Sequence, residues 1–179
     1  MKTLKPSTWL KWRSARRIST IPNWTDTNVT YPIKSNNAFR QRHGLAGKFV
    51  VMYSGNLGLT QPLGQVVLAA DKLRHREEIQ FVLVCRVASK PQLELRVREL
   101  GVPNVMFLDY QPRSQLTESL SAADIHLVPL DPAFVRCLMP SKLYGILASG
   151  TPVLALTDQQ CQLAKNRPRR RSRLSPRSR

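Results

Sequence analysis

From residue 49 onward, short hydrophobic runs alternate with longer stretches in which apolar and polar positions are mixed. Each run is almost continuously apolar over four to six residues, which is typical of strands covered on both faces. The predicted strands lie at residues 49–53, 79–84, 105–108, 125–129 and 152–156, and the predicted helices at about 61–75, 91–100, 113–122 and 140–149. This alternation predicts an α/β fold, in which a Rossmann-like parallel sheet has right-handed crossovers and helices on both faces.

Proline and glycine mark the ends of two of these helices. Pro91 stands at the start of one predicted helix and Gly101 just past its end, and Pro140 and Gly150 flank the last predicted helix in the same way. Glycine closes a helix because it readily adopts the left-handed conformation. These signals support the helix assignments.

Both ends of the chain lack the alternation. The first 48 residues include an extended-looking segment at 21–24 and are interpreted as a lead-in or linker. Residues 158–179 are rich in arginine and offer little apolar surface for a core, so we expect a disordered tail. The 179 residues therefore predict a lead-in over 1–48, one Rossmann-like domain over 49–157 and the tail.

The net charge of +17 is concentrated at the two ends. Residues 1–17 carry six basic and no acidic side chains and residues 158–179 carry eight and one, so the 140 residues between them contribute only +4. A basic tail allows an alternative function, that of a non-catalytic module that binds nucleic acid through its phosphates. The tail disfavours this alternative because it has no aromatic residue on which a base could stack.

Apolar runs and cysteines bear on where the protein works. No run approaches the ~20 residues of a membrane-spanning helix, and no continuous apolar segment follows the basic N-terminus as in a secretory signal. Three cysteines without a C-x-x-C spacing predict reduced thiols, with Cys85 buried and no metal bound. We therefore expect a cytoplasmic protein. Trp9 and Trp12 lie among basic residues, and two roles remain open for this N-terminal segment. It is either a peripheral anchor on the inner face of the membrane or a helix that packs on another domain.

The loops that follow the strands are where a ligand is expected, because open parallel sheets bind ligands outside the carboxyl ends of their strands. The first loop holds Gly55, Asn56 and Gly58, where glycines would let backbone N–H groups approach a phosphate. The alternative is that these glycines only allow a sharp turn. Their spacing is not a dinucleotide fingerprint, and no acidic residue follows Cys85 at the end of the second strand, which disfavours a nicotinamide-dependent dehydrogenase.

A second candidate site lies at the start of the last predicted helix, where Ser141 supplies a hydroxyl and Lys142 a positive charge. Together with the N–H groups of a helix start, they would suit a diphosphate. The alternative is an ordinary helix start with a solvated lysine. His126 lies inside an apolar strand pattern and is interpreted as a core histidine rather than a base. No spacing indicates a catalytic triad, a carboxylate pair or a metal cluster.

Five motifs occur in the order and at the spacing of one known family. They lie at residues 21–26, 53–58, 104–112, 122–130 and 139–153, the last being Met-Pro-Ser-Lys-Leu-Tyr-Gly-Ile-Leu-Ala-Ser-Gly-Thr-Pro-Val. With these motifs, the chain from about residue 18 to residue 156 resembles the C-terminal, donor-binding half of a bacterial GT-B glycosyltransferase of family four. The resemblance is greatest to the branch that builds capsule, colanic-acid or O-antigen sugars.

The resemblance implies a retaining transfer from a nucleotide sugar that lies between two Rossmann-like domains, without an obligatory metal or other cofactor. It implies that the donor diphosphate lies on the Gly55 to Gly58 turn and on Ser141 and Lys142. It also implies that the base contacts the backbone near Tyr110 and Gln111. It assigns no catalytic residue.

The sequence also departs from this family. The acceptor-binding domain is not in this chain, and the glutamates of a common Glu-x7-Glu pattern correspond to Cys137 and Gly145. The arginine and lysine that usually follow the first strand are replaced by Asn56 and, approximately, Gln61. After Leu156 the family pattern stops. We therefore expect a chain truncated at both ends, and inactive unless a separate polypeptide supplies the acceptor domain.

Overall fold

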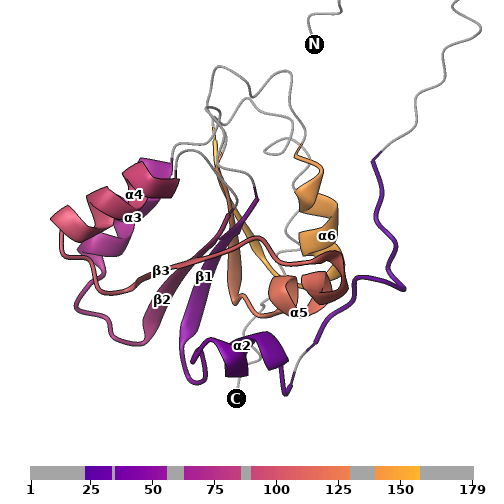
Figure 1. Cartoon of the computed structure of the whole chain (residues 1–179). Coiled ribbons are helices and arrows are strands. Elements are labelled where there is room, and N and C mark those ends of the chain that lie inside the picture. The colour runs from indigo at the N-terminus through magenta and orange to yellow at the C-terminus, as the bar shows by residue number, and fades with distance from the viewer. Residues whose placement is uncertain (1–22, 34, 56–62, 86–89, 130–139, 158–179) are drawn as a thin grey trace, which may run out of the picture.

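The computed structural model describes residues 23–33, 35–55, 63–85, 90–129 and 140–157. Within them, five strands form one parallel sheet in the order β3-β2-β1-β4-β5 (Figure 1). The strands are β1 (Phe49–Ser54), β2 (Ile79–Val84), β3 (Val105–Leu108), β4 (Ile125–Pro129) and β5 (Val153–Leu156). The predicted fold is confirmed, and the predicted strand bounds differ from the observed ones by at most one residue.

Helices cover both faces of this sheet. The helices are α2 (Ala38–Arg42), α3 (Leu63–Lys72), α4 (Lys90–Glu99), α5 (Leu116–Ser121), which a 3-10 turn at Arg113–Gln115 precedes, and α6 (Lys142–Ala148). Helices α3 and α4 lie together over one face, and α2, α5 and α6 lie on the other (Figure 1). The four predicted helices are confirmed: α3, α5 and α6 are somewhat shorter than predicted, and α4 is shifted by one residue.

Successive side chains of a strand point to opposite faces of the sheet, so each strand contributes to two cores. In β1, Val51 and Tyr53 pack on the side of α3 and α4, whereas Val50 and Met52 pack with Phe39 of α2. These five side chains are almost completely buried. Because both faces are covered, the apolar runs in the sequence are continuous instead of alternating.

Helix α2 is an element that the sequence pattern does not predict. Its five residues are too few to show a helical period. The Asn37 side chain caps it by accepting a hydrogen bond from the Arg40 backbone N–H at 3.1 Å, and its Nδ2 donates to the Glu118 carbonyl of α5 at 2.9 Å. Phe39 and Leu45 are buried in the core. Part of the expected lead-in therefore belongs to the packed body of the domain.

The segment 23–33 lies beside α5 and α6. Ser121 Oγ donates to the Tyr31 carbonyl at 3.1 Å, which fastens the segment to the end of α5. Pro32 contacts Gly150, which follows α6 with a φ of 72°. A Cβ at position 150 would lie 3.0 Å from Pro32 Cγ, so both the conformation and the close approach require glycine.

Strand β5 forms one edge of the sheet, and β4 is its one partner among the residues that the structure describes. Leu154 is 46% exposed there, and Ala155 is exposed as well. Neither a charged residue nor a proline interrupts Val153–Leu156. Within the described part of the chain, this edge is therefore short, apolar and open.

Several predictions for the chain ends concern residues outside the described ranges. These are the lead-in before residue 23, with Trp9 and Trp12, and the tail over 158–179. In the part of the chain that is described, no helix combines the length and the apolar character needed to cross a membrane.

Candidate functional site

The crossover connections change sides between β1 and β4. These two strands are neighbours, but the chain after β1 leads to α3 on one face and the chain after β4 leads to α6 on the other. In open α/β sheets, ligands bind in the crevice that such a switch point leaves outside the carboxyl ends of the strands. Both loops singled out in the sequence begin at this switch point, and we call the place outside the ends of β1 and β4 the donor crevice.

Gly55 and Lys142, one from each loop, lie in contact. A Cβ placed on Gly55 would lie 3.0 Å from Lys142 Nζ and 3.4 Å from the Tyr53 hydroxyl oxygen. The Gly55 backbone has a φ of 151°, and its N–H donates to the Val84 carbonyl at 3.0 Å, which ties the turn to β2. A side chain at position 55 would be strained and would press on the ammonium group.

The Lys142 side chain lies over the ring of Tyr53. Its Nζ is 4.0 Å from the ring centroid, which is a cation–π contact. Tyr53 is fully buried near the end of β1. Burial, with a smaller contribution from the charge of Cys85, raises the pKa of its phenol above the ordinary value, so the hydroxyl stays protonated. No local sequence pattern points to Tyr53, because its role depends on the contact with a residue 89 positions away.

Lys142 is not the solvated lysine that the alternative interpretation expected. Desolvation lowers the pKa of its ammonium group to about 8, since burial disfavours the charged form. The side chain is partly buried at the crevice. A lysine with this pKa is still mostly charged at neutral pH, and a neighbouring anion would favour the charged form further.

His126 of β4 is confirmed as a core histidine. It is fully buried, and its Nε2 lies 3.0 Å from the Leu120 carbonyl oxygen, to which it donates. Burial is the main cause that lowers the pKa of His126 to about 4, and the positive charge of Lys142 lowers it further. The imidazole is therefore neutral at physiological pH and takes no part in proton transfer at the crevice.

Tyr110 and Gln111 follow β3, two strands away from β1. At ~4.8 Å between strands, they lie about 10 Å along the edge from the end of β1. Tyr110 is 53% exposed, and Gln111 Nε2 donates to the Asp109 carbonyl at 2.8 Å. They share the carboxyl edge of the sheet with Lys142 but do not belong to the Lys142–Gly55–Tyr53 cluster.

The remaining predicted residues flank the two loops. Ser141 precedes α6 with an exposed side chain, and it makes no side-chain capping bond to the helix. Asn56 and Gly58 lie outside the described residues.

An ion pair that the sequence analysis does not predict joins the loops after β2 and β3. Lys90 Nζ lies 2.8 Å from Asp109 Oδ1. Their hydrogen bond raises the pKa of Lys90 and lowers that of Asp109. The position of Asp109 directly after a strand is the sequence signal that could have pointed to a role at this edge of the sheet. The pair holds the chain that leads into Tyr110.

Cys85, at the end of β2, is buried as predicted, and burial raises the pKa of its thiol. Among the described residues, no group of three or more His, Cys, Asp or Glu side chains could hold a metal ion.

A parallel sheet of this order, with helices on both faces and a switch point between β1 and β4, defines the class of Rossmann-like α/β domains. The family model of glycosyl transferases group 1 matches residues 35–161. The chain belongs to this family, and the resemblance inferred from the motifs is confirmed.

Two curated relatives carry related names. The chain is 29% identical over 155 residues to the "Putative colanic acid biosynthesis glycosyl transferase WcaI" of Escherichia coli (strain K12), covering 85% of this chain and 38% of the relative. It is 24% identical over 156 residues to the "Probable glycosyltransferase WbjE" of Pseudomonas aeruginosa, covering 87% of this chain and 39% of the relative. The chain thus spans about two fifths of the length of these relatives.

Solved structures share the fold. The C-terminal domain of the glycosyl transferase group 1 protein LpcC from Francisella tularensis matches with a TM-score of 0.60 at 20% identity, over 73% of this chain and 69% of that one. Anabaena Alr3699/HepE, solved in complex with UDP-glucose, matches with a TM-score of 0.61 at 21% identity, over 84% and 41%. WaaG, a glycosyltransferase involved in lipopolysaccharide biosynthesis, matches with a TM-score of 0.63 at 20% identity, over 79% and 38%.

Proposed function

We propose that this chain is the nucleotide-sugar binding domain of a glycosyltransferase, and that it serves transfer to a polysaccharide or lipid-linked acceptor when a separate polypeptide supplies the acceptor domain. Family membership supports the transferase class. The name of the relative WcaI supports a role in polysaccharide synthesis, and the UDP-glucose in the HepE complex supports a nucleotide sugar as the donor. The nucleic-acid-binding alternative rests on charge alone and is not favoured.

The contact between Gly55 and Lys142 is the observation that carries this proposal. A diphosphate in the crevice would meet the Lys142 ammonium, and the missing Cβ of Gly55 leaves room for a phosphate oxygen beside it. Hydrogen bonds between a cation and a phosphate are roughly twice as strong as neutral ones. The proposal assigns the Ser141 hydroxyl, Asn56 and Gly58 to the same diphosphate.

The lysine has a role in the reaction as well as in binding. When the bond between the sugar and the diphosphate breaks, negative charge grows on the departing phosphate. A cation already held in place stabilises that charge more in the transition state than in the ground state. The Tyr53 ring keeps the Lys142 ammonium at this position without neutralising it. The proposal names no nucleophile or general base.

The nucleoside end of the donor would extend along the edge towards β3. Tyr110 presents an exposed ring there, and the Lys90–Asp109 pair fixes the chain just before it. In this arrangement the base lies against the backbone of Tyr110 and Gln111. The sugar then lies outside β1 and β4, where an acceptor domain has access.

The proposal includes a cellular location. A cytoplasmic setting is supported by Cys85, which is a buried and protonated thiol. A peripheral contact with the inner face of the membrane would involve the segment with Trp9 and Trp12, which is rich in basic residues.

Titration calorimetry with UDP and UDP-glucose on the full chain tests the proposal. Gly55→Ala should weaken binding about tenfold or more, because a methyl group would occupy the space beside the ammonium. Gly47→Ala is the matched control: Gly47 also has a positive φ, 71°, but its Cβ would meet nothing within 4 Å. It should bind like the parent. A folded parent that binds neither UDP nor GDP, or two variants with equal affinity, would contradict the proposal.

A further inference from the structure

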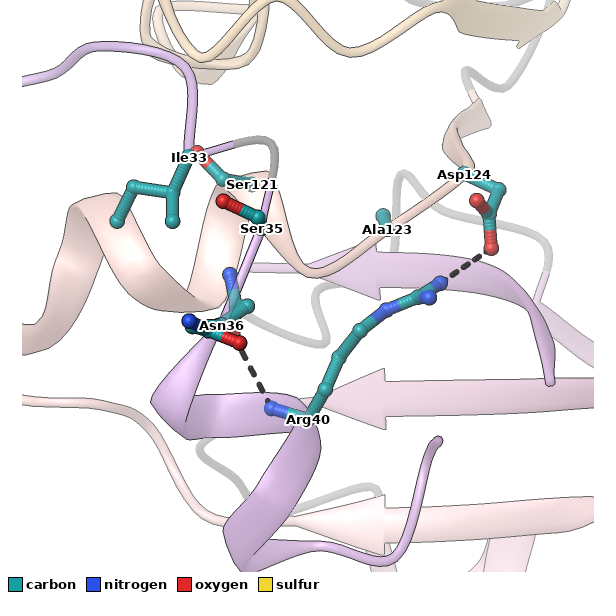
Figure 2. Close-up of a pocket in the computed structure, with 8 residues that line it drawn as sticks. Ile33, Ser35, Asn36, Arg40, Ser121, Ala123 and Asp124 are labelled. Carbon is teal, nitrogen blue, oxygen red and sulfur yellow. Dashed lines mark hydrogen bonds and ion pairs between the residues drawn. The ribbon is translucent and has the colours of Figure 1, made fainter. Parts of the chain in front are cut away.

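A pocket of about 350 Å³ lies beside Arg40 and Asp124 (Figure 2). Its wall comes from the segment around α2 and from the turn between α5 and β4. Asp124 lies in this wall just before β4, and its carboxylate accepts from the backbone N–H of Val50 at the start of β1 at 2.7 Å. The pocket therefore faces the amino ends of β1 and β4, and no residue assigned to the donor site lines it.

An ion pair between Arg40 and Asp124 forms one side of the pocket (Figure 2). Arg40 Nε also donates to the Ala122 carbonyl at 2.8 Å, and Arg40 Nη2 to the Lys48 carbonyl at 3.3 Å. The two side chains are nevertheless 27% and 36% exposed. The pair is held rigidly and still reaches solvent.

The contacts of this pair use only some of its polar atoms. Among the described residues, they engage Nε and Nη2 of Arg40 and Oδ2 of Asp124. The two N–H groups on Arg40 Nη1 and the oxygen Oδ1 of Asp124 are left for a ligand. A donor and an acceptor thus stand side by side, with their charges already balanced by each other.

Polar side chains also line the other side of the pocket. Figure 2 shows Ser35, Asn36 and Ser121 there, together with the apolar side chain of Ile33. Asn36 has a φ of 51°, a left-handed conformation that asparagine tolerates better than most residues. Its exposed amide can both donate and accept hydrogen bonds.

This lining selects for one chemical class of ligand. The charges of Arg40 and Asp124 cancel, so neither a phosphate nor a metal cation gains net attraction. An apolar ligand would leave the donors and acceptors without partners, which is unfavourable. Adjacent hydroxyl groups fit, because each hydroxyl can donate to the carboxylate oxygen and accept from the guanidinium. The volume is at the lower end of the ~300–1,000 Å³ of small-molecule sites.

We propose that the pocket formed by Arg40, Asp124, Asn36 and Ser121 binds an uncharged sugar unit through a pair of neighbouring hydroxyls. This second site lies apart from the nucleotide crevice. It would let the domain hold a saccharide chain while the donor is bound at the other end of the sheet.

The test is an amide NMR titration of the full chain with methyl glycosides of glucose, galactose, mannose and fucose at millimolar concentrations. Saturable shifts are expected at residues 35–37 and 121–124 with at least one glycoside. They should persist when UDP is present. Asn36→Gly, which keeps the positive φ and removes the amide, should weaken binding about two- to tenfold.

Asn28→Gly, at an exposed asparagine outside the pocket wall, is the matched control and should bind like the parent. Ser35→Tyr, which places a ring at the exposed rim, should abolish the shifts while the rest of the spectrum stays folded. The proposal is overturned if no glycoside gives saturable shifts or if both pocket variants bind like the parent. It is also overturned if sulfate shifts the same amides more strongly than the glycosides, or if UDP displaces the sugar.

Discussion

Lys142→Met separates the charge of Lys142 from its packing. Methionine keeps an unbranched apolar stem that can lie on the Tyr53 ring, but it carries no ammonium. If Lys142 holds the donor diphosphate, the variant loses one charge-assisted hydrogen bond, worth about 1.5–3 kcal/mol. This corresponds to a roughly 10- to 150-fold weaker affinity for UDP.

The same substitution should leave the fold at least as stable as the parent at pH 7. The pKa of Lys142 is about 8 instead of the ordinary 10.5, so folding disfavours its charged form. The upper limit of this effect is roughly 3 kcal/mol, and partial exposure of the side chain reduces it. Between pH 8 and 10.5 the unfolded chain binds a proton that the folded chain has lost, so the parent gains stability as pH rises. Lys142→Met should lack this gain.

Calorimetric titration with UDP and urea unfolding at pH 7 and pH 10 measure the two effects on the same samples. Lys72→Met, which removes a lysine from α3 on the other side of the sheet, is the control and should change neither. The reasoning is refuted if Lys142→Met binds UDP like the parent. It is equally refuted if affinity and stability fall together, because that result would make Lys142 a structural residue only.

Three other predictions follow from the contacts in the structure and from the directions of its pKa shifts. Binding of UDP-glucose, whose diphosphate does not titrate near neutral pH, should take up a fraction of a proton per site at pH 8, because an anion beside Lys142 restores its charge; calorimetry in two buffers of different ionisation enthalpy should show uptake at pH 8 and almost none at pH 6. The fold should lose stability as pH falls from 6.5 towards 4, because His126 takes up a proton in the unfolded chain but not in the folded chain. Urea unfolding at both pH values should show a smaller decrease in the free energy of unfolding for His126→Gln than for the parent. Arg40→Met should destabilise the fold by about 2–3 kcal/mol in urea unfolding, because two carbonyls and the Asp124 carboxylate lose their partner; an effect under about 0.5 kcal/mol would show that water replaces the guanidinium.

The strands and most helices could be predicted because their signals are local. The run Phe49 to Tyr53 is apolar throughout because both faces of this strand are covered. Helix α2 has no such signal, since a five-residue helix buries Phe39 without showing a period. The Arg40–Asp124 pair joins residues 84 positions apart, and no local pattern could have paired them.

The candidate site could be predicted only in outline. Gly55 and Lys142 both follow strands, and this position predicts that they lie at the carboxyl edge of the sheet. Their contact depends on β1 and β4 being neighbours, which the strand order decides and the sequence pattern does not. The burial of Lys142 depends on the Tyr53 ring, and that is why a solvated lysine was a reasonable expectation from the sequence alone.

The open edge at β5 makes the behaviour of this protein in solution dependent on salt. Among the described residues, the outer backbone groups of β5 have no strand partner, and with the exposed Leu154 and Ala155 they form a template on which a second molecule can add a strand. The net charge of +17 keeps molecules apart at low ionic strength. At about 0.1 M salt that repulsion is screened beyond ~10 Å, and edges can then meet. The net charge of the chain thus takes the place of the proline or lysine that commonly protects such an edge. Low salt should therefore keep the chain monomeric, whereas added salt should favour association.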